Sequence, residues 1–233
     1  MKTRNLVFSG VLILVLALGG GAWWFFKSLD SLVKRAIERW GPEITGVTVR
    51  VGSVRIEVAQ GRGTIRGLVI GNPKGFEAPY ALKAAEISVS LDPASLTRDV
   101  VVVKELLLAS PDVYYVRGPG GDNMSAIQRN VDAWVAQHAG PKSAGSGPGK
   151  KFIIENVIVR NGRAHFGTAA SAPIPDLHLR DVGKRTNGAT AGEVFRQVWA
   201  ALLRSVGNLA GNLGGAIKDG AKSATGGVRK LFK

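Results

Sequence analysis

The chain contains no cysteine, which excludes disulfides, thiolate nucleophiles and cysteine-ligated zinc or iron–sulfur centres. Its only histidines are His138, His165 and His178, and none has a second histidine or a carboxylate at helix spacing for a metal ion. The glycine-rich stretches at 19–21 and 118–121 lack the Lys-Ser or Lys-Thr of a phosphate-binding loop. The carboxylates are scattered and form no acid–base pair. We therefore predict a non-enzymatic protein that needs no cofactor and no metal.

Long hydrophobic runs are also absent, with one exception near the amino terminus. Residues 6–26 contain no ionisable group and, at about 1.5 Å per residue, reach across a hydrocarbon core of about 30 Å. The run closes on Trp23, Trp24, Phe25 and Phe26, which is typical of a membrane–water interface. We predict a retained transmembrane anchor over residues 1–27. The alternative is a cleaved secretory signal, for which Gly20 and Ala22 form a weak small-x-small site.

Negative charge is scarce: 17 acidic residues face 31 Lys and Arg, which gives a net charge of +14. This balance favours an anionic partner, either a phospholipid surface or nucleic acid. The cationic residues do not follow an aromatic-studded sheet face, as a nucleic-acid site requires. We expect a membrane partner and no nucleic acid.

Residues 28–42 predict a short amphipathic helix at the membrane surface, ended by Gly41-Pro42. A β domain over residues 43–182 follows, because apolar residues then recur at every second position. Val47, Val49 and Val51 share one strand face, and Val54, Ile56 and Val58 share another. Later strands are expected at 65–70, 85–91, 100–108 and 111–116, with a kink between the last two. Such an antiparallel meander must cover its apolar face with something.

The remaining segments are helices, a loop and more strands. A helix after Asn123 carries one apolar stripe, and residues 138–151 read as a flexible loop. Strand pattern returns over 152–166, with Asn161-Gly162 in the position of a two-residue hairpin turn, and again over 174–182. The stripe of the helix is formed by Ile127, Val131, Trp134 and Val135.

Residues 183–233 predict a spacer, an amphipathic helix and a basic tail. The apolar seam of this helix has steps of three and four residues. Gly207, Gly211 and Gly215 form a neighbouring stripe, which either permits close helix approach and self-association or frays the helix end. The seam consists of Phe195, Trp199, Leu202, Val206, Leu209 and Leu213.

A series of short motifs between residues 46 and 182 resembles the amino-terminal part of the AsmA family of Gram-negative bacteria. A G-L-x-I-x-N-P-x-G-F segment begins at Gly67 and precedes a strand that ends in D-x-x-S-L. An x-L-x-x-P-x-V strand and a G-x-N turn follow. The motif positions that we expect to be structural are Asn72, Pro73, Gly75, Phe76, Asp92, Leu96, Pro111 and Asn123.

The resemblance implies a single-pass inner-membrane protein whose periplasmic sheet curls into a groove, related to chorein-type lipid-transfer proteins. It also implies a role in outer-membrane biogenesis or phospholipid trafficking. The chain is shorter than typical members, so a bridge across the periplasm is not expected of it alone. The expected fold class is α+β, mainly antiparallel, with an N-terminal transmembrane helix, a curved sheet with short helices and a C-terminal amphipathic helix.

One-sided alternation in a membrane-tethered chain leads to our functional hypothesis: the dry face of the sheet binds phospholipid acyl chains. The alternative is a structural or interaction subunit of a membrane complex, in which this face packs against the chain's own helices. The residues expected to contact lipid are Val49, Val51, Ile56, Val58, Ile65, Leu68, Ile70, Ile87, Val89, Leu91, Leu106 and Leu108.

Overall fold

The computed structural model describes residues 29–118, 120–138, 150–167 and 170–231, with the side chains of the last helix described to residue 213. The predicted anchor, residues 1–27, and most of the predicted loop 138–151 lie outside these residues. Within the described part, no helix combines the length and the apolar character needed to cross a membrane. The protein is α+β with a mostly antiparallel sheet, as predicted.

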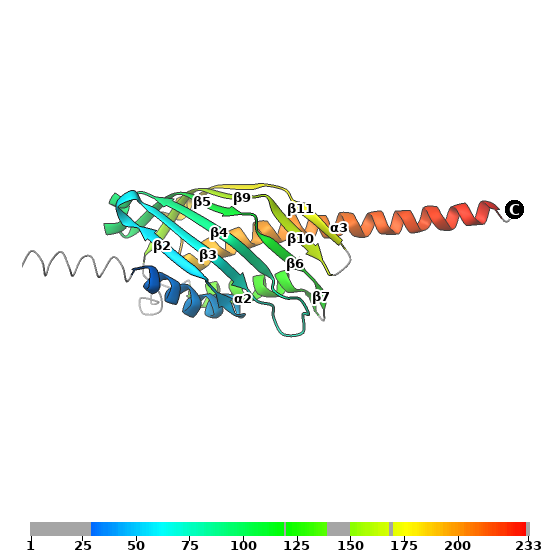
Figure 1. The fold of residues 1–233 in the computed structure, drawn as a ribbon, viewed down its shortest axis with the longest axis horizontal. Coiled ribbons are helices and arrows are strands. Elements are labelled where there is room, and N and C mark those ends of the chain that lie inside the picture. Colours follow the sequence, from blue (N-terminus) through cyan, green and yellow to red (C-terminus); the bar gives the residue numbers. More distant parts are fainter. Residues whose placement is uncertain (1–28, 119, 139–149, 168–169, 232–233) are drawn as a thin grey trace, which may run out of the picture.

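The elements follow one another along the chain as strands interrupted by helices (Figure 1). The described helices are residues 29–45, α2 (Asn123–His138) and α3 (Ala191–Leu231), with the 3-10 turns η1 (Val58–Gln60), η2 (Pro93–Thr97) and η3 (Lys184–Thr186). The strands are β1 (Val49–Arg50), β2 (Ser53–Glu57), β3 (Arg62–Ile70), β4 (Leu82–Leu91), β5 (Val100–Ala109), β6 (Asp112–Tyr115), β7 (Arg117–Gly118), β8 (Gly121–Asp122), β9 (Lys151–Arg160), β10 (Gly162–Phe166), β11 (Ala170–Ile174) and β12 (Leu177–Val182).

The short strands of the main sheet join end to end into long ones. β1 continues into β2, β5 into β6 and β9 into β10, while β11 and β12 lie end to end on the next position. The order across the sheet is β1/β2, β3, β4, β5/β6, β9/β10 and β11/β12. All neighbours are antiparallel except β5/β6 and β9/β10, which are parallel. A parallel pair needs a crossover, and the segment that contains α2 supplies it.

The Asn161-Gly162 prediction was wrong. β9 and β10 do not pair with each other as a hairpin would; both run beside β5 and β6. Asn161 has a φ of 57°, and its neighbour Ser110, between β5 and β6, has a φ of 49°. These left-handed residues lie where two adjacent strands bend. The two bends are at the same level of the sheet, since the Ser110 N–H donates to the Arg160 carbonyl at 2.9 Å. The predicted kink before Pro111 is confirmed.

These bends belong to a crease that crosses every long strand. Residues on one face of a regular strand are an even number of positions apart. On each side of the crease, one row of directly paired residues runs across the sheet. On every strand the two rows are five positions apart, which is an odd number. Members of both rows nevertheless pack in the same core. The first row is Val54, Ile65, Ile87, Leu108, Val159 and Leu177, and the second is Val49, Ile70, Leu82, Val113, Ala164 and Ala172.

Because the offset is odd, the side-chain alternation of each strand shifts by one residue at the crease. The apolar residues therefore face the inner side on both sides of the crease. This corrects the prediction of two separate faces for residues 47–51 and 54–58, since Val49 and Val54 belong to the two rows just described. Val58 does not continue the strand, because it begins the η1 turn. The inner face therefore runs uninterrupted across the sheet although its sequence period is broken.

Helices α2 and α3 lie on the inner face, behind the sheet in the view of Figure 1. The Trp199 indole nitrogen donates to the Met124 carbonyl at 3.0 Å and joins the two helices. The apolar stripe predicted for α2 packs in the core, and so do Leu202 and Val206 of the predicted α3 seam. Beyond the sheet, α3 continues away from the body of the molecule (Figure 1). The helical assignment of this segment is confirmed.

The first helix runs to residue 45, so Gly41-Pro42 does not end it as predicted. It stops at Gly46, which has a φ of 71° and donates its N–H to the Pro42 carbonyl at 2.9 Å. Pro42 is tolerated inside the helix, and Gly41 permits close packing, since a Cβ there would lie 2.8 Å from the Val49 side chain. The helix therefore presses directly on β1.

Three charged residues of this helix occupy the free edge of β1 and β2. Asp30 accepts the Ile56 N–H at 2.8 Å, and Glu38 accepts the Val51 N–H at 3.0 Å. Lys34 donates to the Gly52 carbonyl at 3.0 Å. Spaced four residues apart, these side chains take the place of a neighbouring strand and cover an edge that otherwise invites pairing with another chain.

Candidate functional site

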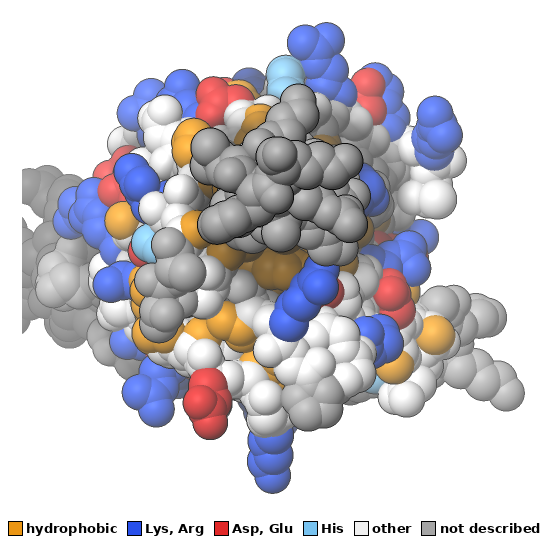
Figure 2. All heavy atoms as spheres, turned by 90° about the vertical axis from the view of Figure 1, so that its right-hand side faces the viewer, with side chains coloured by type: hydrophobic (Ala, Val, Ile, Leu, Met, Phe, Trp, Pro, Cys, Tyr) orange, Lys and Arg blue, Asp and Glu red, His pale blue; other side chains and the backbone are white. Residues whose placement is uncertain are grey.

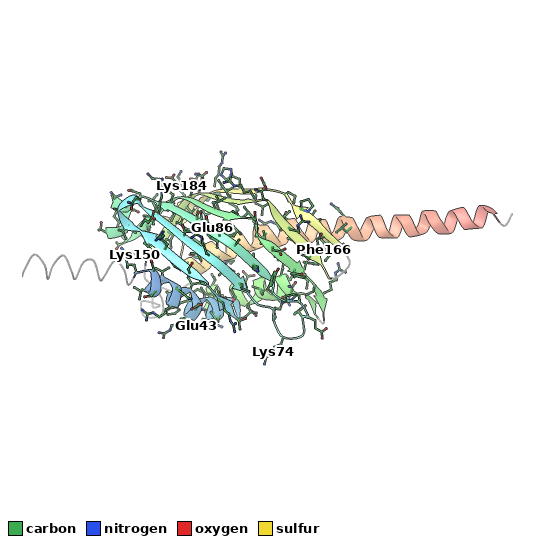
Figure 3. The ribbon with its side chains drawn as sticks, viewed as in Figure 1. Glu43, Lys74, Glu86, Lys150, Phe166 and Lys184 are labelled. Carbon is green, nitrogen blue, oxygen red and sulfur yellow. The ribbon has the colours of Figure 1, made fainter. Side chains whose placement is uncertain are left out.

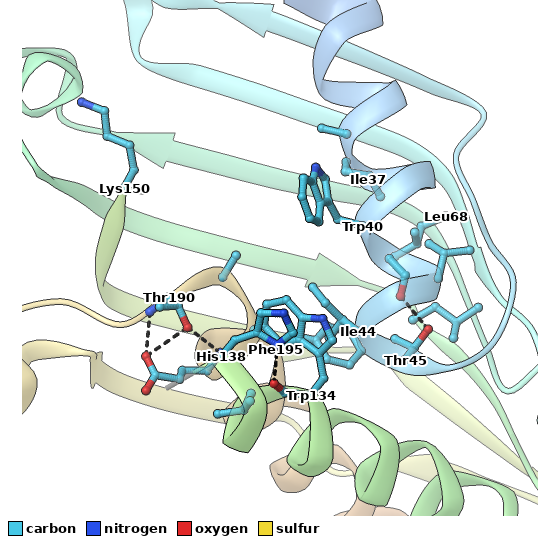
Figure 4. A pocket seen from close by; sticks show the side chains of 18 of the residues that line it. Ile37, Trp40, Ile44, Thr45, Leu68, Trp134, His138, Lys150, Thr190 and Phe195 are labelled. Carbon is cyan, nitrogen blue, oxygen red and sulfur yellow. Dashed lines mark hydrogen bonds between the residues drawn. The ribbon is translucent and has the colours of Figure 1, made fainter. Parts of the chain in front are cut away.

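A cavity of about 470 Å³ lies between the first helix, the sheet and the ends of α2 and α3 that face each other (Figure 4). Trp40 projects from the first helix into this space, opposite Trp134 and Phe195. Its apolar lining comes from all four elements. The aliphatic members are Ala36, Ile37, Ile44, Val49, Ile65, Leu68, Ile70, Val135 and Ala191.

Several polar groups around the cavity are bonded to the protein itself. Thr45 donates to the Gly41 carbonyl at 2.7 Å, and the His138 Nδ1 lies 2.7 Å from the Trp134 carbonyl oxygen while its ring stacks on the Trp134 indole. Thr190 and Glu193 form a capping box at the start of α3, in which the Glu193 carboxylate accepts the Thr190 N–H at 2.8 Å. The space is therefore apolar in chemistry as well as in composition.

Four of the residues predicted to contact lipid line this cavity: Val49, Ile65, Leu68 and Ile70. Their shared position could not follow from local spacing, because the crease separates Ile65 from Ile70. Residues of β1 and β3, which the sequence predicts only as parts of two separate strands, therefore line the same cavity.

The other predicted residues fall into two groups. Val51 and Leu108 are buried, at 3% and 6% exposure, and Leu108 belongs to the core under the helices. The remaining ones are half-buried on the side of the crease that carries Ile65. They are Ile56, Val58, Ile87, Val89, Leu91 and Leu106.

The half-buried residues lie between the cavity and a second core, against which Val89, Leu91 and Leu106 pack. Ile56 pairs with Gly63, Gly63 with Val89 and Val89 with Leu106, so they form one row. Gly63 leaves this row without a side chain in the middle, where an added Cβ would lie 3.4 Å from Ile56. We call this row, the cavity and Ile87 the open half of the inner face.

Under the packed parts of α2 and α3 the inner face is closed. Met124, Ile127 and Val131 of α2 and Val113 of β6 are 0% exposed, and Leu202 of α3 is 1% exposed. They fill the space between sheet and helices. We call this region the sealed half. In this half the chain's own helices cover the sheet.

Figure 2 looks at the end of the molecule where α3 leaves the sheet. Lys and Arg side chains surround this end, and hydrophobic side chains collect in a hollow at its centre. Tyr115 and Phe166 pack against the core from β6 and β10, with their rings 5.9 Å apart. Gly207 and Gly211 have open space where a Cβ would be, so in this structure no other described element approaches the glycine stripe.

The motif residues of the corner between β3 and β4 have structural roles. Asn72 donates to the Ala78 carbonyl at 2.9 Å and accepts from the Asn123 side chain at 2.7 Å. Asn123 is fully buried and also donates to the Tyr114 carbonyl. Two motif asparagines 51 positions apart therefore bind each other and tie the corner to the start of α2. Gly75 adopts a φ of 88°, a left-handed value that favours glycine.

The other motif positions are structural as well. Asp92 caps η2 by accepting the Ala94 N–H at 3.1 Å, and fully buried Ser95 accepts the Val102 N–H at 2.9 Å. The Leu96 carbonyl accepts from Lys150 at 2.9 Å. The Phe76 ring packs closely on Gly118, where an added Cβ would meet it, and the Phe76 N–H donates to the Pro73 carbonyl. Pro111 packs against Gly162.

A polar cluster on the outer face escaped the sequence analysis. Asp112 accepts from the Tyr80 hydroxyl at 2.9 Å and lies 2.6 Å from the His165 Nε2. The His165 ring stacks on the Tyr114 ring. His178 is not part of this cluster: its Nε2 lies 2.9 Å from the Asn156 side-chain oxygen on the adjacent strand β9. The contacts require the parallel pairing of β6 and β10, which local spacing does not reveal. Among the described residues, no group of three or more potential ligands is placed to hold a metal ion.

Comparison with protein-family models, with characterised proteins and with solved structures gave no match to this chain.

Proposed function

We propose that the protein is a membrane-anchored lipid-binding or lipid-transfer protein of the AsmA-like type, which shields acyl chains on the inner face of its sheet. The observation that carries this proposal is the apolar cavity of about 470 Å³, flanked by half-buried apolar residues on one side of the crease. At about 25 cal/mol per Å² of apolar area, covering part of one acyl chain there provides several kcal/mol.

The predicted anchor supports the proposal, since it would hold this cavity at a membrane that supplies the ligand. The motif resemblance adds the proposed setting: the inner membrane, with the bulk of the chain in the periplasm and a role in outer-membrane biogenesis or phospholipid trafficking. No catalytic group is needed, because shielding is passive. Release would follow from the equilibrium between the cavity and a nearby membrane.

The sealed half favours a second candidate, a structural or interaction subunit of an envelope membrane complex. There the inner face is already covered by α2 and α3, and α3 continues past the sheet as an extended helix (Figure 1). In that case the open half is the seat of a partner protein. A photoreactive group at Val89 separates the two candidates, because lipid adducts support shielding and protein adducts support the subunit.

The proposed function is tested by identifying lipid that purifies with the full chain from a mild detergent. We expect mass spectrometry to find phospholipid with the wild-type protein. Ile65→Asp places a carboxylate in the cavity wall, which costs several kcal/mol against an apolar ligand, so bound lipid should fall about tenfold or more. Absence of lipid from the wild type would reject the proposal.

Thr64→Asp is the matched control. Thr64 precedes Ile65 on β3, and its side chain projects to the other face, beside Ser88. It should keep the wild-type amount of lipid. Equal loss in both variants would show that the charge acts on folding, and equal retention in both would show that lipid sits elsewhere.

A further inference from the structure

We infer that the cavity is a blind pocket for one acyl chain, entered tail first, so that the protein holds a single chain instead of conducting lipid along a through-channel. This inference rests on the proposed lipid-binding function and adds to it the ligand's form and direction. It is carried by the burial gradient along the cavity, the bonding of its polar groups and its volume.

The two ends of the cavity differ in exposure. Lys151, Thr190 and Ala191 are exposed at one end. At the other end Thr45 and Ile70 are both 2% exposed. The cavity therefore has a mouth beside the starts of β9 and α3, and a floor against β1 and β3.

In the part of the chain that the structure describes, the cavity ends at its floor. Trp134 and Val135 bound the cavity from the last turn of α2. One and two turns earlier on the same helix, Val131 and Ile127 are fully buried in the sealed half. A chain that enters at the mouth therefore ends at this packed layer and does not emerge where α3 leaves the sheet.

Several polar groups near the lining are already bonded within the protein. Lys150, near the mouth, donates to the Leu96 and Arg98 carbonyls at 2.9 and 2.6 Å, and its stem points away from Trp40 (Figure 4). Among the described residues, the one buried side-chain N or O atom without a hydrogen bond is Oε1 of Gln128, which does not line the cavity. Apolar cavities of this kind stay dry and accept apolar ligands.

The volume limits the ligand to one chain. Ligand cavities range from roughly 300 to 1,000 Å³, and 470 Å³ lies in the lower part of that range. The space suits one extended hydrocarbon chain, with the headgroup left at the exposed mouth.

The test is a chain-length series. The full-length protein, held in an amphipathic polymer, is dialysed against saturated fatty acids from decanoic to eicosanoic acid. Polymer without protein is the blank. Each affinity is calculated from the concentration of free fatty acid in water. A blind pocket predicts that affinity rises about fourfold per methylene and then stops rising when the pocket is full. A rise that continues to the longest acid would overturn the blind pocket and leave the proposed function standing.

Leu68→Trp shortens the pocket, because Leu68 lines it, and should move the limit to shorter acids. Val69→Trp is the matched control, since Val69 is the next residue on β3 and points to the opposite face. It should leave the limit unchanged. An equal shift in both variants, or none in Leu68→Trp, overturns the inference.

A second series with lysophosphatidylcholines of the same chains identifies the source of the chain. The same length limit in both series indicates recognition of the chain alone. A limit seen only with fatty acids assigns the ligand to free acids, and one seen only with lysolipids assigns it to membrane lipid. If neither class binds above the blank, the blind pocket and the proposed function fail together.

Discussion

The two halves of the inner face have similar composition and different cover. In the sealed half, Ile127 and Val131 fill the space over the sheet and are fully buried. In the open half, Ile87 and Val89 have the same aliphatic chemistry and remain half-buried at the margins of the two cores. The strand pattern is therefore insufficient to tell a core from a binding surface. The difference arises from where the helices lie.

The cover itself differs in strength. α2 and α3 are joined through apolar packing and the Trp199 hydrogen bond. The apolar side chains of the first helix are half-buried or exposed, and the helix adds side-chain hydrogen bonds at the strand edge. Elements with few buried contacts open at lower free energy. We expect the roof of the cavity to open before the sealed half does.

The largest expected effect breaks the sealed half. Ile127→Ala removes three buried carbons and should lower the free energy of unfolding by about 3 kcal/mol. Ile87→Ala, the matched truncation in the open half, should cost about 1 kcal/mol, because that side chain is already partly in water. Urea unfolding followed by circular dichroism measures both. Equal losses would abolish the distinction between the halves.

A smaller effect concerns the polar joint that holds α2 over the sealed half. Asn123→Ala leaves the Val116 N–H and the Tyr114 carbonyl without their buried partner, so we expect a loss of about 2 kcal/mol. Adding Asn72→Ala to this variant should cost less than it does in the wild type, because the two side chains bind each other. Strict additivity in a double-mutant cycle would contradict the joint.

The roof of the open half should respond locally. Glu38→Ala removes the acceptor of the Val51 N–H, with an expected loss of about 1 kcal/mol and faster hydrogen exchange at Val51. Glu43 lies on the same helix and points outward (Figure 3), so Glu43→Ala is the control. Unchanged exchange at Val51 would show that the edge contact does not hold the helix.

The smallest effect is a pH dependence on the outer face of the sheet, behind the sealed half. Burial, followed by the hydrogen bond to Asp112, raises the pKa of Tyr80 from its ordinary value of 10.0 to about 12. The folded state thus holds this proton more tightly than the unfolded chain does. Its stabilisation is complete below pH 10 and is lost as the pH rises through 12.

Tyr80→Phe should therefore lose less stability than the wild type between these two pH values in parallel thermal melts. An identical decline in the two proteins would show that the hydrogen bond to Asp112 does not carry this dependence.

Much of the fold could be predicted where local periodicity carries the information. The α3 seam is an example, since Trp199, Leu202 and Val206 are buried as their spacing indicates. The corner at Asn72 and the cap at Asp92 were recognisable because turn and cap chemistry is local. The wrong hairpin at Asn161 has the same origin, because Asn-Gly favours positive φ in a hairpin and in a bent strand alike.

The candidate site could be predicted only in part. Ile65 and Leu68 were expected on the apolar face, and they line the cavity. Trp40, Trp134 and Phe195 were assigned to three separate helices, and nothing in their spacing indicates that they meet. Likewise, Asp112 and His165 meet only because β6 and β10 run parallel.

The amino-acid sequence by itself determined which residues are apolar, which segments are strands or helices, and that one side of the sheet is dry. Pairing between distant strands decided the rest: the crease that carries the apolar rows across the sheet, and the division of one dry face into sealed and open halves. The physical reason is range. Periodicity and turn chemistry act over a few residues, whereas burial depends on which distant segment occupies the adjoining space.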